Sequence, residues 1–331
     1  MEFKPCLRFL NILCVFQVFV LVQSSGACGE HLSNVLRSLS FDEPYVHIES
    51  KPPNSFSKGV GPKIEIGPST SPITTSVDTD TPFHLWLSQE HFGNGNHALG
   101  MSIDRESSLT RIGKKSKVEL NFVRHDEYAT DEFYNHRFIL KDGVGLYLGF
   151  AFRLGTDYEA PNRWVLHFQV WESSSIARPN VQPPLALVVD PNRSLDKDYI
   201  WMMLIKRNDF FANNAPTYDN GQKLLFSDGS EYVKVKRNRW YSIVFFLRPS
   251  PDDLSLTEGG LNSRSIMMWI NGLEVLNHKG SWGYSSNVLS DPRNYSIKLG
   301  IYRAAQNTSQ TVYFDSIRWG TSFDAVDPSA R

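Results

Sequence analysis

The sequence of 331 residues predicts an all-β protein, an antiparallel β-sandwich of the jelly-roll type. Short aromatic and β-branched runs recur from about residue 83 to residue 320, and turn residues such as Lys141-Asp142-Gly143 separate them. Helical spacing of apolar residues is almost absent, and there is neither an internal repeat nor a heptad pattern. We therefore expect one large β domain built from many short strands.

Each expected strand is a run of alternating or continuous apolar residues bounded by turn residues. The runs are Phe83–Leu87, Lys117–Val123, Gly145–Leu154, Trp164–Trp171, Leu185–Val189, Ile200–Ile205, Lys223–Phe226, Trp240–Leu247, Ser265–Ile270, Ile297–Tyr302 and Thr311–Trp319. Asn271-Gly272 gives the strongest hairpin signal, because a type I′ turn needs positive φ at both central residues. Only Cys28–Leu39 has apolar residues at helical spacing, so a short helix is expected there.

The first residues of the chain have the pattern of a secretory signal. Lys4 and Arg8 give a basic start, Phe9–Val22 is apolar, and small residues follow up to Ala27. The apolar run is short for a membrane span, which needs about 20 residues, although a retained signal anchor is the open alternative. We therefore expect residues 1–27 to be removed, and the mature chain to be secreted and extracellular with no membrane attachment.

Two further segments complete the expected organisation. Residues 28–82 form an N-terminal extension with the short helix and a loop rich in Pro, Ser, Thr and Gly, in which Ile64-Glu65-Ile66 supplies an edge strand. Residues 83–331 form the single sandwich domain. Removal of the signal leaves Cys28 as the one remaining cysteine, so no internal disulfide can form. Cys28 is then free, modified or paired with another molecule.

Charge and glycosylation signals limit the partners of the chain. It carries 34 Lys and Arg against 35 Asp and Glu. A dedicated nucleic-acid binder would carry a basic surplus, so no nucleic-acid partner is expected. Asn192, Asn294 and Asn307 each begin an Asn-x-Ser sequon, which is an acceptor for glycosylation if the host is a eukaryote. We expect a monomeric, secreted glycoprotein whose chemistry depends on local clusters of side chains.

The run Trp164–Trp171 alternates apolar side chains with side chains that can contact a ligand. The apolar ones, expected in the core, are Leu166, Phe168 and Val170. The others, expected together on the opposite face, are His167, Gln169 and Trp171. Taken one at a time, a histidine or a tryptophan on a strand is more often structural than functional.

Two other strands show the same alternation. Lys117–Val123 leaves Lys117, Glu119 and Asn121 on one face, and Lys298 and Tyr302 share a face in the stretch NYSIKLGIYR at 294–303. Aromatic rings can stack on a sugar ring, and the polar groups can hydrogen-bond to its hydroxyls. We therefore expect the three strands to form a concave face that binds a glycan, and the alternative is a solvated outer face with no ligand.

Other catalytic patterns are poorly supported by the sequence. The acidic pairs Asp126-Glu127 and Asp131-Glu132 are adjacent residues, which face opposite ways on a strand, whereas a glycosidase aims two carboxyl groups at one bond. The sequence has no nucleophile elbow, phosphate-binding loop or zinc-protease motif, and no acidic loop with calcium spacing. We expect no cofactor and no catalytic metal, while a structural calcium ion stays open.

Several stretches of the chain are similar to one group of enzymes. They are Lys-Val-Glu-Leu at 117–120, the strand with Gln169, WYSIVFFLRPS at 240–250, SIMMWINGLEV at 265–275, IKLGIYR at 297–303 and VYFDSIRWG at 312–320. Over about 110–320 the chain resembles the heparin-lyase-like and glucuronan-lyase-like polysaccharide lyases, which share a β-jelly-roll sandwich with the alginate lyases. The hairpin and the closing strand are scaffold features, so they support the fold more than the activity.

The resemblance implies β-elimination on an acidic polysaccharide. In this reaction the uronate carboxylate is neutralised, a base removes the proton from the neighbouring carbon, and an acid protonates the departing glycosidic oxygen. The resemblance implies Tyr302 as the proton-transferring residue, Tyr295 as the second candidate and His167 as an auxiliary base.

The resemblance also implies a set of substrate-binding residues. Glu119, Asn121 and Gln169 would neutralise the carboxylate by hydrogen bonding, with Lys117 as a charge partner. Lys298 and Arg303 would lower the pKa of the catalytic tyrosine, which is about 10 in an unperturbed side chain. The strand alternation, and not the resemblance, adds Trp171 as an aromatic surface for the sugar.

The chain departs from the pattern of these lyases at three positions. Lys117 stands where related lyases often have arginine, Trp171 where they commonly have the histidine of Gln-x-His, and Ser296 where alginate lyases have the catalytic tyrosine. Three hypotheses therefore stay open. The chain is a lyase for a uronic-acid polysaccharide, a catalytically inactive carbohydrate-binding protein on the same fold, or a structural extracellular protein without a sugar site.

Overall fold

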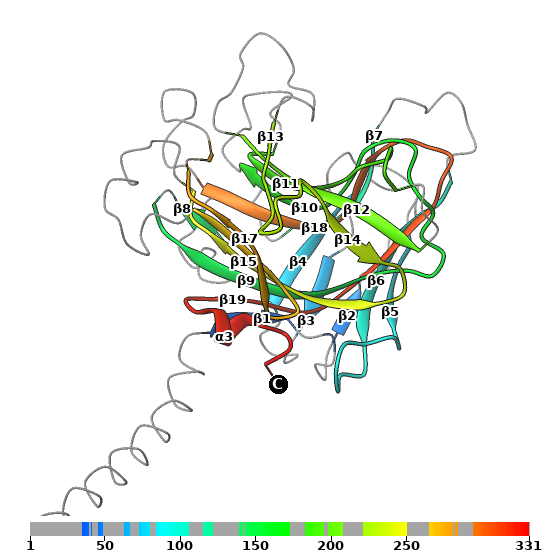
Figure 1. Cartoon of the computed structure of the whole chain (residues 1–331). Helices are drawn as coiled ribbons and strands as arrows, with labels where there is room; N and C mark the ends of the chain where they lie inside the picture. The colour runs from blue at the N-terminus through cyan, green and yellow to red at the C-terminus, as the bar shows by residue number, and fades with distance from the viewer. Residues whose placement is uncertain are drawn as a thin grey trace, which may run out of the picture.

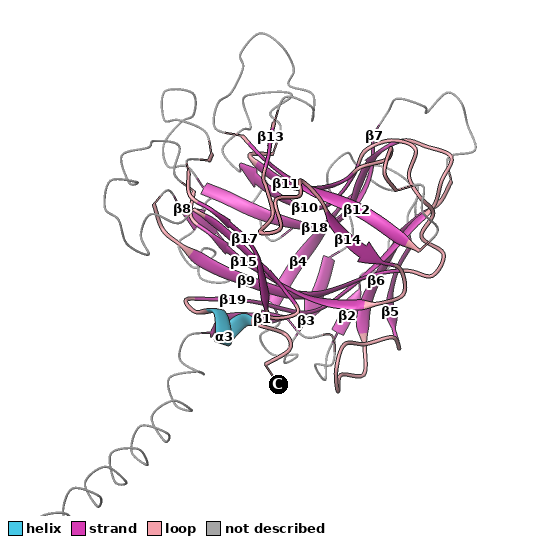
Figure 2. Cartoon of the chain, viewed as in Figure 1, coloured by secondary structure: helices cyan, strands magenta, loops and turns pink. Residues whose placement is uncertain are grey.

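The structure is a computed structural model of the chain. It describes residues 35–39, 41, 46–48, 63–66, 73–79, 84–105, 115–121, 139–141, 143–172, 183–194, 198–207, 221–249, 265–280, 282–283 and 294–330. These residues form two antiparallel sheets that pack face to face (Figure 1). Figure 2 shows that strands dominate the described part of the chain, with one short helix. The predicted all-β antiparallel sandwich is confirmed.

One layer is an 8-stranded sheet. In spatial order its strands are β17 (Leu273–His278), β16 (Ile266–Ile270), β15 (Trp240–Leu247), β9 (Leu146–Leu154), β19 (Gln310–Gly320), β6 (Ala98–Ile103) and β5 (His84–Ser88), and β1 (Val35–Leu39) also pairs with β19. The hairpin between β16 and β17 turns at Asn271 and Gly272, whose φ values are 51° and 76°. Both values are positive, so the predicted turn at Asn271-Gly272 is confirmed.

The other layer is an 11-stranded sheet. In spatial order its strands are β13 (Gln222–Lys223), β12 (Tyr199–Lys206), β11 (Leu185–Val189), β10 (Val165–Glu172), β18 (Asn294–Ala304), β7 (Lys115–Asn121), β4 (Ile73–Thr79), β3 (Lys63–Ile66) and β2 (Val46–Ile48), with β14 (Val233–Lys236) on β12 and β8 (Ile139–Lys141) on β18. The strands β7, β18 and β10, which carry most of the predicted site residues, are therefore direct neighbours.

Aromatic rings from both sheets form the centre of the core. Phe168 of β10 stacks on Phe245 of β15, with ring centroids 4.6 Å apart and an interplanar angle of 10°. Phe150 of β9 lies 6.4 Å from Phe168 and 6.0 Å from Phe314 of β19. Large buried rings provide much of the burial energy of a core, so this cluster holds the two layers together.

The helix α3 (Phe323–Val326) covers the outer face of the 8-stranded sheet. Ala325 and Val326 pack against Val244 of β15, with Trp269 of β16 beside them. In Figure 1 this helix lies next to β19, close to the C-terminus. Among the described helices, none has the length and apolar character needed to span a membrane.

The N-terminal segment departs from the expected helix. Val35–Leu39 is the strand β1, which pairs with Ile317–Gly320 of β19. On this side of β19, β6 pairs only with the residues up to Phe314, so β1 meets backbone groups that would otherwise lack a partner. Backbone pairing with another segment overrides a weak helical pattern here. Cys28 and the predicted signal, residues 1–27, lie outside the described residues.

The register between β10 and β18 shifts at one point. Leu166 pairs with Tyr302 and Phe168 with Leu299, so Gly300 and the residue after it stand opposite a single residue of β10. That single residue is His167, which is in turn an extra residue relative to β11. The arrangement is a β-bulge, which reverses the in-and-out alternation of a strand where it occurs.

Glycine is required on the β18 side of this bulge. Gly300 has a φ of 154°, which side chains of L-residues rarely tolerate. A Cβ atom at this position would lie 2.2 Å from the carbonyl oxygen of Val118 and 2.7 Å from Cα of Glu119 in β7. The close approach of β18 to β7 and the backbone conformation both exclude a side chain at Gly300.

His167 is fixed inside the bulge by two hydrogen bonds. Its Nδ1 lies 2.9 Å from the carbonyl oxygen of Gly300, which accepts a proton, so Nδ1 carries the N–H of the neutral ring. Nε2 is then the acceptor for the hydroxyl of Tyr158 at 2.8 Å. Burial lowers the pKa of His167 to about 4, although the hydrogen bond to Gly300 acts in the opposite direction. Burial raises the pKa of Tyr158, which keeps its hydroxyl a donor.

Replacement of Gly300 by alanine should destabilise the fold by about 3 kcal/mol or more, because backbone strain and the contact with β7 add together. Urea denaturation measures this loss. The control is Gly272→Ala, since Gly272 also has positive φ (76°) but no atom within 4 Å of an added Cβ. That variant should lose only about 1 to 2 kcal/mol. Equal losses in both variants would show that β18 can move away from β7.

The free energy of unfolding should fall as the pH drops from about 6.5 towards about 4. The unfolded chain binds a proton at His167 in this range, whereas the folded chain keeps the ring neutral because its pKa is about 4. The loss from this residue amounts to about 3 kcal/mol below pH 4 and is absent above pH 7. Urea melts across this range should show a shallower pH dependence for His167→Gln than for the wild type. Parallel curves would contradict the assignment.

Candidate functional site

The site lies on the face of the 11-stranded sheet that points away from the core. On β7 and β18 the core positions are taken by apolar residues such as Val118 and Ile301. The alternate positions carry the side chains that we call the polar face, which are Lys117, Glu119, Gln169, Trp171, Lys298 and Tyr302. The strand register puts these residues of β7, β18 and β10 side by side.

The centre of the polar face is a buried pair. Gln169 of β10 donates a hydrogen bond from Nε2 to Oε1 of Glu119 in β7, at 2.6 Å. Glu119 is 2% exposed and Gln169 is 1% exposed. Gly300 lies between the two residues on β18, opposite Glu119, and it has no side chain to separate them. The hydrogen bond from Gln169 reaches across β18 to Glu119 of β7 because β18 carries a glycine at this position.

Lys298 is held beside this pair by an aromatic ring. It stands opposite Gln169 in the register, and its Nζ lies 4.9 Å from the ring centroid of Trp171. Lys298 is only 4% exposed. A lysine ammonium over the face of an indole is attracted by the π electrons, and the attraction increases when the charge is shielded from water. The ring of Trp171 therefore positions a buried positive charge.

Two polar atoms of the polar face have unused hydrogen-bonding capacity. Oε1 of Gln169 and Nε1 of Trp171 are buried, and neither has a hydrogen-bond partner among the described residues. A buried polar atom without a partner costs about 1–3 kcal/mol. Oε1 of Gln169 is an unused acceptor and Nε1 of Trp171 an unused donor, and both lie next to the Lys298 ammonium. This combination suits a ligand that has hydroxyl groups and a negative charge.

Tyr302 lies at the other end of the polar face and is partly exposed. Its ring packs edge to face on Trp164, at a centroid distance of 5.2 Å. Lys115 of β7 places its Nζ 5.7 Å from the same ring, and Lys117 stands opposite Tyr302 in the register. Tyr302 therefore lies between an indole ring and the lysines of β7.

His167 does not belong to the polar face. Its ring packs 5.5 Å from Phe152 and 5.6 Å from Tyr158, both of which lie in the core. The expectation that His167 faces the same way as Gln169 is therefore wrong. The physical reason is the bulge, which turns His167 inward and turns Leu166, expected in the core, outward into a small cluster beside Tyr302.

Tyr295 and Arg303 also point away from the polar face. Tyr295 is completely buried, and its ring lies 6.2 Å from that of Trp282. Arg303 is completely buried and donates hydrogen bonds to the carbonyl oxygens of Thr308 and Asp104. Both residues occupy the same alternate positions of β18 as Ile297 and Ile301, so the strand turns them towards the core.

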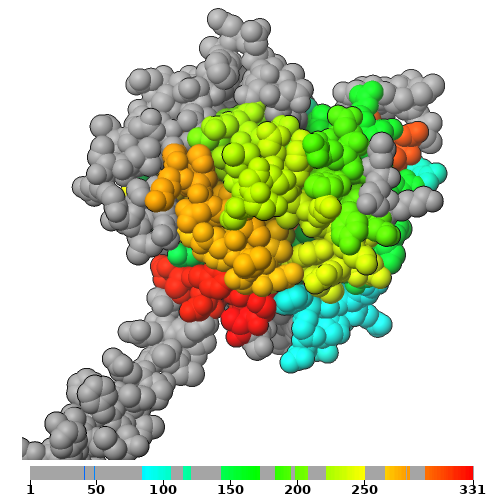
Figure 3. Space-filling view, viewed as in Figure 1, coloured from blue at the N-terminus to red at the C-terminus, as the bar shows by residue number. Residues whose placement is uncertain are grey.

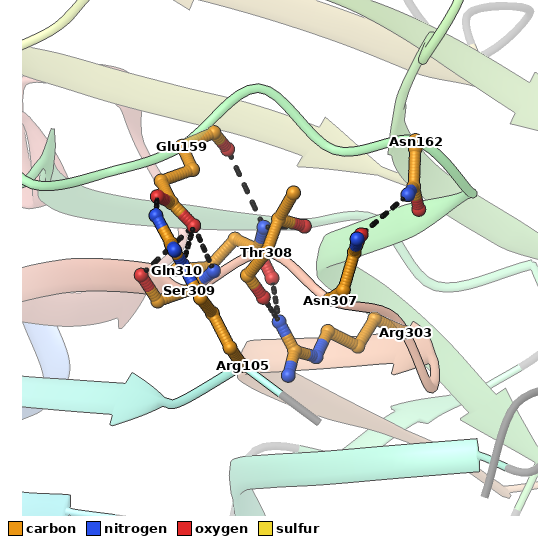
Figure 4. Close-up of polar contacts among 8 residues, drawn as sticks. All are labelled: Arg105, Glu159, Asn162, Arg303, Asn307, Thr308, Ser309 and Gln310. Atoms are coloured by element: carbon orange, nitrogen blue, oxygen red, sulfur yellow. Dashed lines mark hydrogen bonds and ion pairs between the residues drawn. The ribbon is translucent and has the colours of Figure 1, made fainter. Parts of the chain in front are cut away.

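Figure 4 shows the network that includes Arg303. Arg303 also donates to the side chain of Gln310, and Glu159 binds Arg105 and accepts a hydrogen bond from the backbone N–H of Ser309 at 2.7 Å. These contacts join the turn between β18 and β19 to the loop after β9. The role that they support for Arg303 is to brace this end of the sandwich. Asn121 is described by its backbone alone, opposite Lys298.

Two residues beside Tyr302 were not among the predicted site residues. Lys115 stands two residues before Lys117, and Trp164 stands two residues before Leu166. For Lys115 the period-two alternation was a usable signal. For Trp164 the alternation gave no usable signal. It put Trp164 on the core side with Leu166, and only the bulge turns both residues towards Tyr302. In the described part of the chain, no three His, Cys, Asp or Glu side chains gather in a way that could hold a metal ion.

Comparison with known proteins agrees with this fold. The structure is similar to that of an endo-β-1,4-glucuronan lyase from the fungus Trichoderma reesei, with a TM-score of 0.51, 14% sequence identity, and coverage of 77% of this chain and 94% of that one. An alginate lyase from Pseudomonas aeruginosa gives a TM-score of 0.42, 12% identity, and coverage of 68% and 83% respectively. A search of curated proteins finds no match to this sequence.

The sequence itself carries the family assignment. Residues 85–318 match the family described as polysaccharide lyase. The matched range includes β7, β10 and β18 and therefore the whole polar face. The resemblance noted in the sequence is confirmed, and the chain belongs to the polysaccharide lyase family.

Proposed function

We propose that the protein is a secreted lyase that cleaves a uronic-acid-containing polysaccharide by β-elimination. The observation that carries this proposal is the buried Glu119–Gln169 pair beside the Lys298 ammonium, with an unused acceptor on Gln169 and an unused donor on Trp171. A uronate offers a carboxylate for the cation and the donor, and hydroxyl groups for the acceptor. The pattern of residues 1–27 supports secretion.

The proposed reaction uses the two ends of the polar face. Lys298 and the N–H of Trp171 bind the uronate carboxylate, which makes the C–H on the adjacent ring carbon more acidic. Tyr302, as phenolate, takes this proton, the C–H electrons form a carbon–carbon double bond, and the bond to the glycosidic oxygen breaks. The same tyrosine then returns the proton to the departing oxygen. Glu119 orients the amide of Gln169 and leaves its Oε1 for a sugar hydroxyl.

One observation favours a second candidate, an inactive carbohydrate-binding protein. Of the three proton-transfer candidates in the sequence, only Tyr302 lies on the polar face, since His167 and Tyr295 point into the core. Such a protein would hold the polymer through the same contacts and release no product. The ultraviolet absorbance of the unsaturated sugar, followed with glucuronan, alginate and heparin as substrates, distinguishes the two. Binding without new absorbance supports the second candidate.

Replacement of Tyr302 by phenylalanine should lower kcat by about 10²- to 10⁴-fold, because it removes the proton-transferring group and keeps the ring. Polymer affinity and the urea midpoint should change little. The matched control is Tyr295→Phe, the same change on the same strand but on the core side, which should keep kcat within a few fold. A fully active Tyr302→Phe enzyme would refute the assignment.

Replacement of Trp171 by phenylalanine should weaken polymer binding about three- to tenfold, because it removes the Nε1 donor and keeps a ring under Lys298. Isothermal titration calorimetry on the Tyr302→Phe background measures this change without turnover. Trp164→Phe is the control, the same change directly before the opposite end of β10, where the edge-to-face contact with residue 302 does not require the indole N–H. An unchanged dissociation constant in Trp171→Phe would mean that Nε1 does not contact the substrate.

A further inference from the structure

A group of alternating cations and aromatic rings lies on the 11-stranded sheet at β12 and β14, two and three strands beyond β10 in the pairing order. We call this group the cation–aromatic ladder. Its members are Tyr199, Lys234, Trp201, Arg193, Tyr232 and Lys223. None of these residues takes part in the polar face or in the proposed reaction.

Each cation of the ladder lies against one or two rings. The Nζ of Lys234 is 4.4 Å from the centroid of Trp201 and 6.0 Å from that of Tyr199. The guanidinium carbon of Arg193 is 4.3 Å from the centroid of Tyr232 and 5.9 Å from that of Trp201. Trp201 thus lies between two cations.

The ladder continues at Tyr232. Lys223 lies 5.3 Å from the ring centroid and donates a hydrogen bond to the tyrosine hydroxyl at 3.1 Å. Trp201 and Tyr232 meet edge to face, with centroids 6.2 Å apart. The three cations therefore stand at fixed positions along a row of rings.

The rings order these cations without cancelling their charge. Arg193 and Lys234 are exposed, and neither forms an ion pair with a carboxylate among the described residues. Lys223 is the exception, since its Nζ lies 3.3 Å from Glu231. A cation held over a ring keeps its full positive field and has already lost part of its rotamer freedom, so an anion that binds there meets a preorganised site.

The ladder lies on the same face of the sheet as Tyr302. In β12 the alternate residues Ile200, Met202 and Leu204 belong to the core, so Trp201 and Met203 point to the outer face. Met203 packs against the small apolar cluster that also touches Tyr302. One row of register partners crosses the sheet between the two places, through Tyr302, Leu166, Val188 and Met203.

Tyr302 and the cation–aromatic ladder are close enough for one polymer chain to contact both. Three strand spacings separate Tyr302 from Met203, about 14 Å, and Trp201 is two residues further along β12. The apolar residues between them put no charge of their own on the connecting surface. The segment around residues 221–236 supplies Lys223, Tyr232 and Lys234 of the ladder. In Figure 3 this lime-coloured segment is uncovered on the face towards the viewer.

We propose that the cation–aromatic ladder is a second binding site for the acidic polysaccharide, which holds the carboxylates of sugar units several positions away from the bond that is cleaved. The rings hold the cations in place, and the cations match a polymer that carries one negative group per unit. This inference rests on the proposed function for the identity of the polymer. It assigns the ladder to affinity for long chains and not to the chemical step.

The test compares long and short substrates. The variant is Arg193→Ala/Lys234→Ala, and the control is Lys279→Ala/Arg239→Ala, which removes two equally charged exposed residues outside the ladder. All proteins carry Asn192→Gln, so that no glycan at this sequon covers Arg193. For glucuronan polymer the ladder variant should raise KM about tenfold and leave kcat within twofold. With a tetrasaccharide of the same polymer both constants should stay unchanged, and the control should match the wild type throughout.

A binding measurement keeps this test separate from that of the proposed function. Affinity electrophoresis with the polymer on the Tyr302→Phe background should show the loss of retention in the ladder variant, and added NaCl should reduce the difference. If the wild type shows no lyase activity but the ladder variant still loses retention, the proposed function fails and the ladder stands. Equal retention of ladder variant and control overturns the ladder whatever the activity. Two results overturn the assignment to an acidic polysaccharide. One is that the ladder variant loses retention to the same extent on neutral cellulose derivatives. The other is that the wild type is retained by DNA but not by the acidic polysaccharide.

Discussion

The arrangement of the polar face depends on the β-bulge at which His167 and Gly300 meet. One extra residue in β10 sends the imidazole into the core, where Tyr158 and the carbonyl of Gly300 hold it in one tautomer. The same shift turns Leu166 outward beneath Tyr302. Without the bulge, alternation would place a titratable ring on the outer surface and leave the core position to leucine.

Gly300 links this constraint to the chemistry. Its conformation and its approach to Val118 allow no side chain, and the hydrogen bond between Gln169 and Glu119 passes over the same position. A single residue therefore sets the spacing of three strands and the hydrogen-bond partner of the central amide. The unused atoms of Gln169 and Trp171 follow from this geometry, because the amide has one end fixed by Glu119 and the indole is occupied by Lys298 on its face.

Charge is distributed on this sheet in two different ways. On the polar face Lys298 is nearly buried and lies over one indole ring, which suits a contact that must strengthen during a reaction. In the cation–aromatic ladder Arg193 and Lys234 are exposed and lie between rings, which suits reversible binding of a long anionic chain. An apolar cluster that includes Leu166 and Val188, with Met203 packed against it, lies between the two regions.

The sequence by itself determined the all-β class, the Asn271-Gly272 hairpin, the strands from residue 145 to 320 other than those at 222–236, and the placement of Lys298 and Tyr302 on one face. These features follow from period-two alternation and local turn chemistry, which depend only on neighbouring residues. It did not predict β6, Ala98–Ile103, because that strand is buried on both faces and shows no alternation. Only the tertiary structure decided that His167, Tyr295 and Arg303 leave the site, that Val35–Leu39 is a strand, and that Trp164 and Lys115 flank Tyr302. A bulge, an unpaired backbone edge and contacts between distant strands arise from partners far away in the chain, and no local pattern records them.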